Sequence, residues 1–207
     1  MAGTMPHAIF VETDVDGRGL VAAYAAELPG CAVFAATDDE ATAGMPRRVR
    51  EFAAWLRDNG EQMADFVGDN WYEVERAAAM QGEAGRRRAS FTLDELPPSD
   101  AEFATWLRWL ELAREELAAA LDAVDPAEAR NVLAGLTRQD VAFLAELGGS
   151  EAAAPEDPID RLYAARDTLT DALEAAGPYH DGVRRILRLA IADDLRASAA
   201  LRGDAPE

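Results

Sequence analysis

The second half of the chain contains four signals for helix starts, and these constrain its fold more than any other feature. Residues 99–102 form a capping box, because the Ser99 hydroxyl can accept the N–H of the third helical residue while Glu102 reaches back. Asp125-Pro126 and Asp157-Pro158 each combine an acidic N-cap with proline at the first helical position. A fourth start lies near Gly177, and Gly203 is suited to end the last helix.

Each of these four segments carries apolar residues at spacings of three and four, which form one buried face of a helix. The first link between the helices is short, and the link from Gly148 to Pro158 is longer. Four helices of about 17–23 residues with such faces predict an antiparallel four-helix bundle. The faces consist, helix by helix, of Phe103, Leu107, Leu110, Leu117, Leu121 and Val124; Val132, Leu133, Leu136, Val141, Leu144 and Leu147; Ile159, Leu162, Leu169 and Leu173; and Val183, Ile186, Leu187, Ile191 and Leu195.

Four short runs of apolar or alternating residues earlier in the chain predict β-strands. The Asp16-Gly17 pair between the first two runs supplies the positive φ that a hairpin turn requires. The four predicted strands are residues 7–13, 20–26, 31–36 and 71–75.

A helix is expected between the third and the fourth of these strands. Thr37 to Glu40 is a second capping box, and Asn59-Gly60 suits the end of a helix that runs to Asp58. Pro46 lies inside this span and is expected to kink the helix or restart it. The predicted order of elements in this part is therefore β-β-β-α-β.

The two patterns together predict an α+β protein, in which a small β-β-β-α-β module precedes an all-α bundle. The module is assigned to residues 1–80 and the bundle to residues 99–207. Residues 81–98 are assigned to a linker.

The charge of the chain limits its partners. The 207 residues include 39 acids and 20 bases, all of them arginine, so the net charge is −19. Residues 1–90 hold 15 acids and 9 arginines, and residues 91–207 hold 24 acids and 11 arginines. Surfaces this negative repel phosphate backbones and anionic lipids, so neither nucleic acid nor a membrane is expected as a partner. The basic run Arg86-Arg87-Arg88 is interpreted as an exposed part of the linker.

Cysteine usage and hydropathy indicate the compartment. Cys31 is the single cysteine, which allows no internal disulfide and favours a reducing environment. No basic residue or helix start lies beside Cys31 in the sequence, so it is interpreted as a small strand residue and not as a reactive thiol. No apolar run approaches the roughly 20 residues that span a bilayer, and the first ten residues lack the pattern of a signal peptide. The expected location is the cytoplasm.

Three segments of the first module resemble the core of HicB-type antitoxins. They are Ala-Glu-Leu-Pro-Gly-Cys at 26–31, Thr-Asp-Asp-Glu-Ala at 37–41 and Trp-Leu-Arg-Asp-Asn-Gly-Glu at 55–61, and the resemblance covers about residues 7–77. It implies a partial RNase H fold that lacks nuclease chemistry and covers a small RNA-cleaving toxin. HicB antitoxins normally continue into a DNA-binding ribbon-helix-helix or helix-turn-helix, and neither is predicted here.

The bundle, over about residues 92–203, resembles DinB-like four-helix bundles in the segments 129–140 and 183–194. The resemblance implies three inward histidines that bind a divalent metal. In this chain the corresponding positions are Gly135, Leu189 and Asp193, and the two histidines, His7 and His180, lie elsewhere. The bundle is therefore expected to lack the metal site.

Asp140, Asp193 and Asp194 offer another route to a metal or an acid–base pair, if they converge between the second and fourth bundle helices. The competing interpretation is that most of them are solvated acids on helix surfaces, and it is preferred because no nitrogen ligand is available. The sequence therefore predicts no catalytic residue, no cofactor-binding residue and no metal ligand.

Three functions are consistent with these patterns. The leading hypothesis is a non-enzymatic protein-interaction or binding protein, in which the first module docks a basic, toxin-like protein and the bundle serves a homodimer or a ligand pocket. The alternative is a DinB-like metal- or thiol-dependent transferase or hydrolase. A second alternative is a small-molecule sensor with a bundle cavity near Gly135 and Leu189, because a glycine inside a helix costs about 1 kcal/mol relative to alanine.

Overall fold

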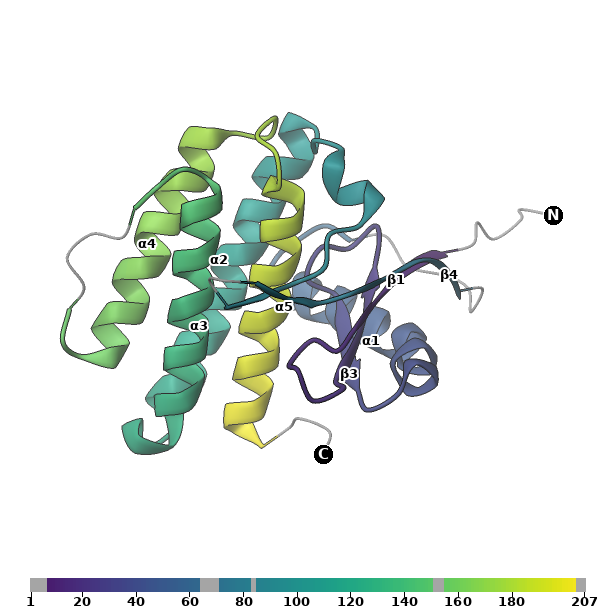
Figure 1. The fold of residues 1–207 in the computed structure, drawn as a ribbon. Coiled ribbons are helices and arrows are strands. Elements are labelled where there is room, and N and C mark those ends of the chain that lie inside the picture. Colours follow the sequence, from purple (N-terminus) through teal and green to yellow (C-terminus); the bar gives the residue numbers. More distant parts are fainter. Residues whose placement is uncertain (1–6, 64–70, 83–84, 151–154, 204–207) are drawn as a thin grey trace. The chain divides into compact units, whose positions relative to one another are not determined.

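The computed structural model describes residues 7–63, 71–82, 85–150 and 155–203 (Figure 1). The chain divides into two compact units, Met1–Glu95 and Leu96–Glu207. The first unit holds a mixed β-sheet with a helix, and the second holds four long helices. The predicted α+β class, with a β-rich part followed by helices, is confirmed.

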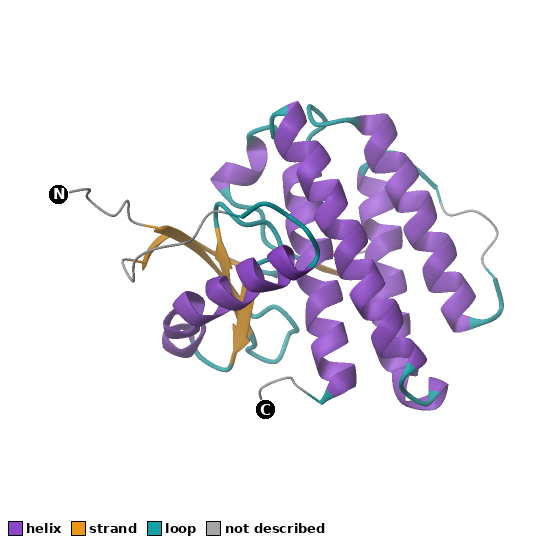
Figure 2. Ribbon diagram, turned by 180° about the vertical axis from the view of Figure 1, so that it is seen from behind, coloured by secondary structure: helices purple, strands orange, loops and turns teal. Residues whose placement is uncertain are grey.

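The sheet of the first unit has four strands in the order β3-β2-β1-β4. The strands β1, β2 and β3 form an antiparallel meander, and β4 pairs with β1 in parallel. This parallel pairing requires a crossover, which α1 provides as it packs against the sheet (Figure 2). The bounds are β1 His7–Thr13, β2 Val21–Ala25, β3 Ala32–Ala35, α1 Asp38–Asp58 and β4 Trp71–Ala78.

Helix α1 begins where the sequence predicts. The Thr37 hydroxyl accepts the N–H of Glu40 at 3.3 Å, and Asn59 caps the other end. The helix is continuous through Pro46 and does not restart there. Its buried face consists of Ala41, Met45, Val49, Phe52, Ala53 and Leu56.

The loop between β1 and β2 is held by its own aspartates. Asp14 adopts φ +55°, and its carboxylate accepts the N–H of Gly19 at 3.1 Å. Asp16 accepts the N–H groups of Arg18 and Leu20 at 2.8 and 3.1 Å. These hydrogen bonds hold the carboxylates within the loop, so the hairpin interpretation accounts for both aspartates.

Residues 79–95 follow β4 and contain further regular structure. The strands β5 (Met80–Gly82) and β6 (Gly85–Arg87) form an antiparallel pair, and a short 3₁₀ helix, η1, spans Thr92–Glu95. Phe91 is buried and stacks on Phe10 of β1 with ring centroids 4.7 Å apart. Most of the predicted linker thus lies in the first unit, and part of it packs on the sheet.

The second unit consists of α2 (Asp100–Asp122), α3 (Pro126–Glu146), α4 (Pro158–Ala176) and α5 (Val183–Arg202). The predicted caps are present: Ser99 and Glu102 form a reciprocal capping box, and Asp125 and Asp157 accept backbone N–H groups of the first turns. Gly203 ends α5 with a positive φ. None of the helices in the described residues has the length and apolar character needed to cross a membrane.

The helices do not all run antiparallel to their neighbours. Arg184, near the start of α5, lies over the Trp106 ring near the start of α2 at 4.6 Å. Farther along, Ser198 Oγ donates to the Glu116 carbonyl at 3.2 Å, so α2 and α5 are parallel.

Helix α3 runs opposite to α5, because Gln139 contacts Asp193 whereas the later Glu146 contacts the earlier Arg185. Helix α4 also runs opposite to α5, to which residues 177–182 join it. It therefore runs parallel to α3, as Figure 1 shows. The predicted antiparallel bundle is wrong for the pairs α2–α5 and α3–α4. The connection after α3 is long enough for α4 to begin at the same end of the bundle as α3, so these two helices run parallel.

Candidate functional site: a buried charge network

Each of the four helices of the second unit contributes a charged residue to one interior cluster: Arg114 on α2, Asp140 on α3, Arg166 on α4 and Asp194 on α5. Asp140 is 5% exposed, and Arg166 and Asp194 are 3% exposed. The side chain of Arg114 is 15% exposed. These four residues, which we call the charge network, are the strongest polar cluster in the described part of the chain.

Helical periodicity explains why they point inward. Arg166 follows Leu162 by four residues and precedes Leu169 by three, and both leucines are fully buried. Arg114 stands in the same relation to the buried Leu110 and Leu117. A side chain at such a position is buried even when it is charged. Because burial of an unpaired charge is costly, the charge must be paired within the unit.

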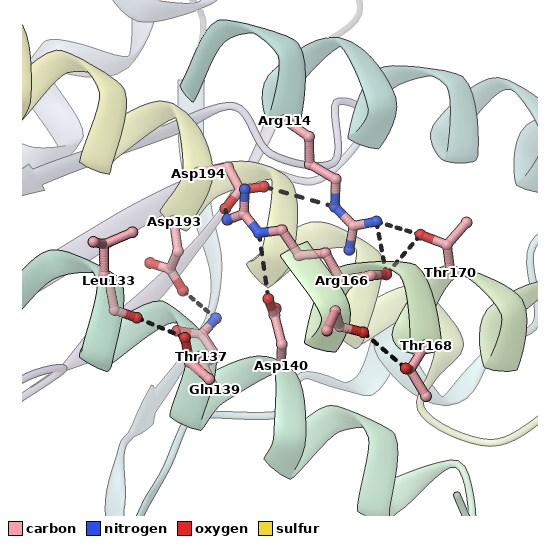
Figure 3. Close-up of polar contacts among 11 residues, drawn as sticks. Arg114, Leu133, Thr137, Gln139, Asp140, Arg166, Thr168, Thr170, Asp193 and Asp194 are labelled. Carbon is pink, nitrogen blue, oxygen red and sulfur yellow. Dashed lines mark hydrogen bonds and ion pairs between the residues drawn. The ribbon is translucent and has the colours of Figure 1, made fainter. Parts of the chain in front are cut away.

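The guanidinium of Arg166 is the centre of the charge network (Figure 3). Its Nε donates to Asp140 Oδ2 at 3.4 Å, and its Nη2 donates to Asp194 Oδ1. Arg166 thus joins α3, α4 and α5. Its remaining nitrogen, Nη1, is buried and has no hydrogen-bond acceptor among the described residues.

Arg114 ties the fourth helix to this centre. Its Nη1 donates to the backbone carbonyl of Arg166 at 3.2 Å and to the hydroxyl of Thr170. Its Nε lies 4.0 Å from Asp194 Oδ2. The charge network therefore connects all four helices, as the dashed lines in Figure 3 show.

A further buried carboxylate, Asp193, precedes Asp194 on α5. Its Oδ2 accepts Nε2 of Gln139 at 2.6 Å, so α3 and α5 are joined a second time (Figure 3). The neighbouring Thr137 hydroxyl donates to the Leu133 carbonyl within α3 at 2.8 Å.

Burial shifts the protonation of the charge network. It raises the pKa of Asp194 to about 7, against the opposing effect of Arg166, and the nearby Asp140 raises it further. Burial likewise raises the pKa of Asp140, again against Arg166 and Arg114. The pKa of Arg114 is lowered by the same desolvation. The two aspartates compete for one central guanidinium, and burial favours the protonated form of both.

This donor set does not suit a divalent metal. Asp140 and Asp194 direct carboxylate oxygens to arginine, and an adjacent guanidinium repels a cation. Of the positions at which DinB-like bundles carry histidine, Gly135 has no side chain and Leu189 is a buried hydrophobic residue. The third, Asp193, accepts a hydrogen bond from Gln139. Within the described ranges no group of three or more potential ligands could hold a metal ion.

The structure corrects the interpretation of the three aspartates. Asp140, Asp193 and Asp194 do converge between α3 and α5, but they are buried and not solvated. Sequence reasoning missed Arg114 and Arg166, their partners. The sequence did contain an indication of both arginines. The predicted apolar faces of their helices are spaced by three or four residues except for one interval of seven, and each arginine lies at the inward position within that interval.

The proposed reasons for Gly135 are also resolved in part. A Cβ added at Gly135 would meet no heavy atom within 4 Å. Close helix approach is therefore not the reason for this glycine, and its half-exposed position does not indicate an enclosed cavity.

The first unit has a buried charge of its own, which sequence reasoning also missed. Glu12 of β1 is fully buried and accepts the Tyr24 hydroxyl at 2.9 Å, Nε of Arg88 at 3.0 Å and the N–H of Ala89 at 2.6 Å. Arg88 is therefore an anchor to the sheet and not an exposed linker residue. The side chains of Arg86 and Arg87 lie outside the described residues.

Cys31 is fully enclosed just before β3. Burial raises the pKa of its thiol to about 12, in spite of the nearby Arg48. A thiol that stays protonated at neutral pH is a poor nucleophile, so the geometry gives no support to a thiol-dependent enzyme.

No protein-family model matches the chain, and neither a curated protein nor a solved structure matches it.

Proposed function

We propose that this chain is a non-enzymatic interaction protein that binds a basic protein through the outer face of α4. The observation that carries the proposal is a row of exposed carboxylates on that face, none of which forms an ion pair within the described part of the chain. The row consists of Asp160, Asp167, Asp171 and Glu174, with the exposed Tyr163 among them.

The spacing of these residues places them on one side of the helix. Successive members are seven, four and three residues apart, which returns to the same face of an α-helix. Tyr163 follows Asp160 by three residues and adds an amphipathic ring to the row. Tyrosine beside charge is typical of surfaces that bind proteins.

The arginines of α4 leave this row unneutralised. Arg166 points into the charge network, and Nε of Arg161 donates to the Pro155 carbonyl at 2.9 Å. Across the described residues, no ion pair joins the four carboxylates to a cation. Asp167 feels the nearby Arg114 electrostatically, but the row as a whole remains negative and can attract a basic surface. Electrostatic complementarity contributes to both the rate and the specificity of such encounters.

The resemblances noted in the sequence support the same class of function. The first unit is proposed to be a HicB-like core, and the β-β-β-α-β order of its first five elements is consistent with this. The second unit is proposed to be a DinB-like bundle that has lost its metal site. HicB-type cores cover small RNA-cleaving toxins, and RNA-binding proteins are commonly basic. The carboxylate row favours a docking face on the helical unit, whereas the sequence hypothesis put it on the first module.

The experiment compares three immobilised forms of the full chain in a native lysate at low salt. The test variant carries Asp167→Asn, Asp171→Asn and Glu174→Gln. The control variant carries Glu111→Gln, Glu115→Gln and Asp122→Asn on α2, which are also exposed and change the net charge equally. Retained proteins are identified by mass spectrometry.

We expect a basic protein that the wild type and the control retain equally, that the test variant retains several-fold less, and that salt releases. Equal retention by both variants would show that only overall charge matters. Retention of no basic protein by the wild type would remove the proposal.

A further inference from the structure

The end of α1 carries an asparagine that is followed by a glycine. Asn59 is the C-cap of the helix, and Gly60 follows it with φ +84°. Both residues are exposed. The other two asparagines of the chain precede Trp71 and Val132. Because glycine has no side chain to hinder its own nitrogen, Asn59 is the asparagine whose side-chain amide is most open to attack by the next backbone nitrogen.

Such an attack converts asparagine into an acid without an enzyme. The nitrogen of Gly60 loses its proton and bonds to Cγ of Asn59, while the bond from Cγ to Nδ2 breaks and Nδ2 leaves as ammonia. Water then opens the resulting five-membered imide ring at either of its two carbonyls, which gives aspartate or isoaspartate. The overall reaction consumes one water and releases one ammonia, and it requires no oxidant and no cofactor.

Two hydrogen bonds of the folded chain oppose this reaction. Nδ2 of Asn59 donates to the Trp55 carbonyl at 2.8 Å, which holds the side-chain amide back over the last turn of α1. The N–H of Gly60 donates to the Arg57 carbonyl at 2.9 Å. The reaction therefore requires that the last turn opens, so that the amide can rotate towards residue 60 and the N–H of Gly60 is released.

The end of α1 is suited to a local opening of this kind. The N–H of Glu61 donates to the Leu56 carbonyl at 3.0 Å, and with the bond from Gly60 to Arg57 it forms a Schellman motif. Residues 57–60 are all exposed, so their release from the helix uncovers no side chain of the core. Helix ends open at a small fraction of the free energy of global unfolding.

We propose that Asn59 is a site of spontaneous deamidation in the folded chain, and that opening of the last turn of α1 sets the rate. The net strength of the two opposing hydrogen bonds corresponds to a rate about tenfold below that of the unfolded chain. This inference concerns the first unit and does not depend on the docking face proposed for α4.

The product does not restore the end of the helix. A carboxylate at position 59 has no N–H to donate to the Trp55 carbonyl, and its negative charge lies at the negative end of the helix dipole. Isoaspartate in addition lengthens the backbone by one carbon atom inside the Schellman motif. Deamidation therefore leaves α1 with a permanently loosened end.

The experiment follows the conversion of Asn59 in the full chain by peptide mass spectrometry over time, under native conditions and in urea. The rate in urea gives the reactivity of the sequence alone, so the ratio of the two rates measures the protection by the fold. Asn131, which is exposed within α3, is the internal control. In two matched variants, Ala54→Gly weakens the last two turns of α1 and Ala43→Gly weakens the first two. Circular dichroism checks that both variants are folded.

We expect Asn59 to convert in the native chain about tenfold more slowly than in urea. Conversion is expected to be several-fold faster in Ala54→Gly than in Ala43→Gly, and Asn131 is expected to stay intact. Asn59→Gln is expected to release no ammonia from this site, because glutamine would have to form a larger ring. The proposal is overturned if native Asn59 stays intact for about a hundredfold longer than its half-time in urea. Equal rates in the native chain and in urea, or equal rates in the two glycine variants, would also overturn it.

Discussion

At the scale of the residue, the second unit depends on one arginine. Arg166 is the only described cation that contacts both Asp140 and Asp194, and all three side chains are nearly inaccessible to water. Removal of one partner from a buried ion pair leaves an uncompensated charge, which costs about 3–5 kcal/mol. We therefore predict that Arg166→Leu lowers the free energy of unfolding by about this amount, measured by urea denaturation with circular dichroism.

The same helix provides a matched control. Arg161→Leu removes an exposed arginine from α4 and is expected to change the stability by no more than about 0.5 kcal/mol. Replacing all four residues of the charge network, Arg114, Asp140, Arg166 and Asp194, by apolar residues is expected to recover much of the loss, because none of its charges is then left buried alone. An Arg166→Leu variant as stable as the control would show that the charge network contributes nothing to folding.

At the scale of the element, α3 contains a residue that weakens it without an evident packing role. Gly135 lies inside the helix, and a Cβ there would meet no atom within 4 Å. Glycine in a helix interior costs about 1 kcal/mol relative to alanine. We predict that Gly135→Ala raises the free energy of unfolding by about 0.5–1 kcal/mol in the same assay. A loss of stability would indicate that the glycine has a role in close packing.

The elements themselves were largely predictable, because caps and apolar spacing are local signals. Ser99, Asp125 and Asp157 cap helices as expected, and the four main strands lie within a few residues of the predicted runs. The direction of α4 was not predictable in the same way, because a connection of this length permits either direction. Parallel pairing of β4 with β1 likewise depends on where the chain returns after α1.

The candidate site was predictable only in part. The sequence offered convergence of Asp140, Asp193 and Asp194 only as the less favoured interpretation, and it did not show that Arg114 and Arg166 on the other two helices lie beside Asp140 and Asp194. A charged residue within an apolar stripe can either be exposed to solvent, where the stripe turns away from the core, or be buried in an ion pair. The spacing of the apolar residues alone does not distinguish these two cases. Tertiary packing decides between these outcomes, because a buried charge is tolerated only where another helix supplies its counter-charge.

At the scale of the whole molecule, charge makes stability depend on pH. Burial raises the pKa of Asp194 to about 7, so the folded chain holds a proton that the unfolded chain, with an ordinary value of 3.8, has already lost. The free energy of unfolding therefore falls as the pH rises from about 4 to about 7, by up to about 1.4 kcal/mol per pH unit for one proton. The raised pKa of Asp140 acts in the same direction. Self-repulsion of a chain with net charge −19 adds to the decline.

These two contributions can be separated by salt and by substitution. Salt screens repulsion between surface charges but hardly affects a buried group. We predict that unfolding measured between pH 5 and 7.5 in high salt still becomes easier as the pH rises in the wild type and in the exposed-acid control Asp167→Asn. Asp194→Asn is expected to flatten the curve, because asparagine resembles the protonated carboxyl and cannot titrate. Equal slopes for all three would show that Asp194 is not the group that makes unfolding depend on pH in high salt.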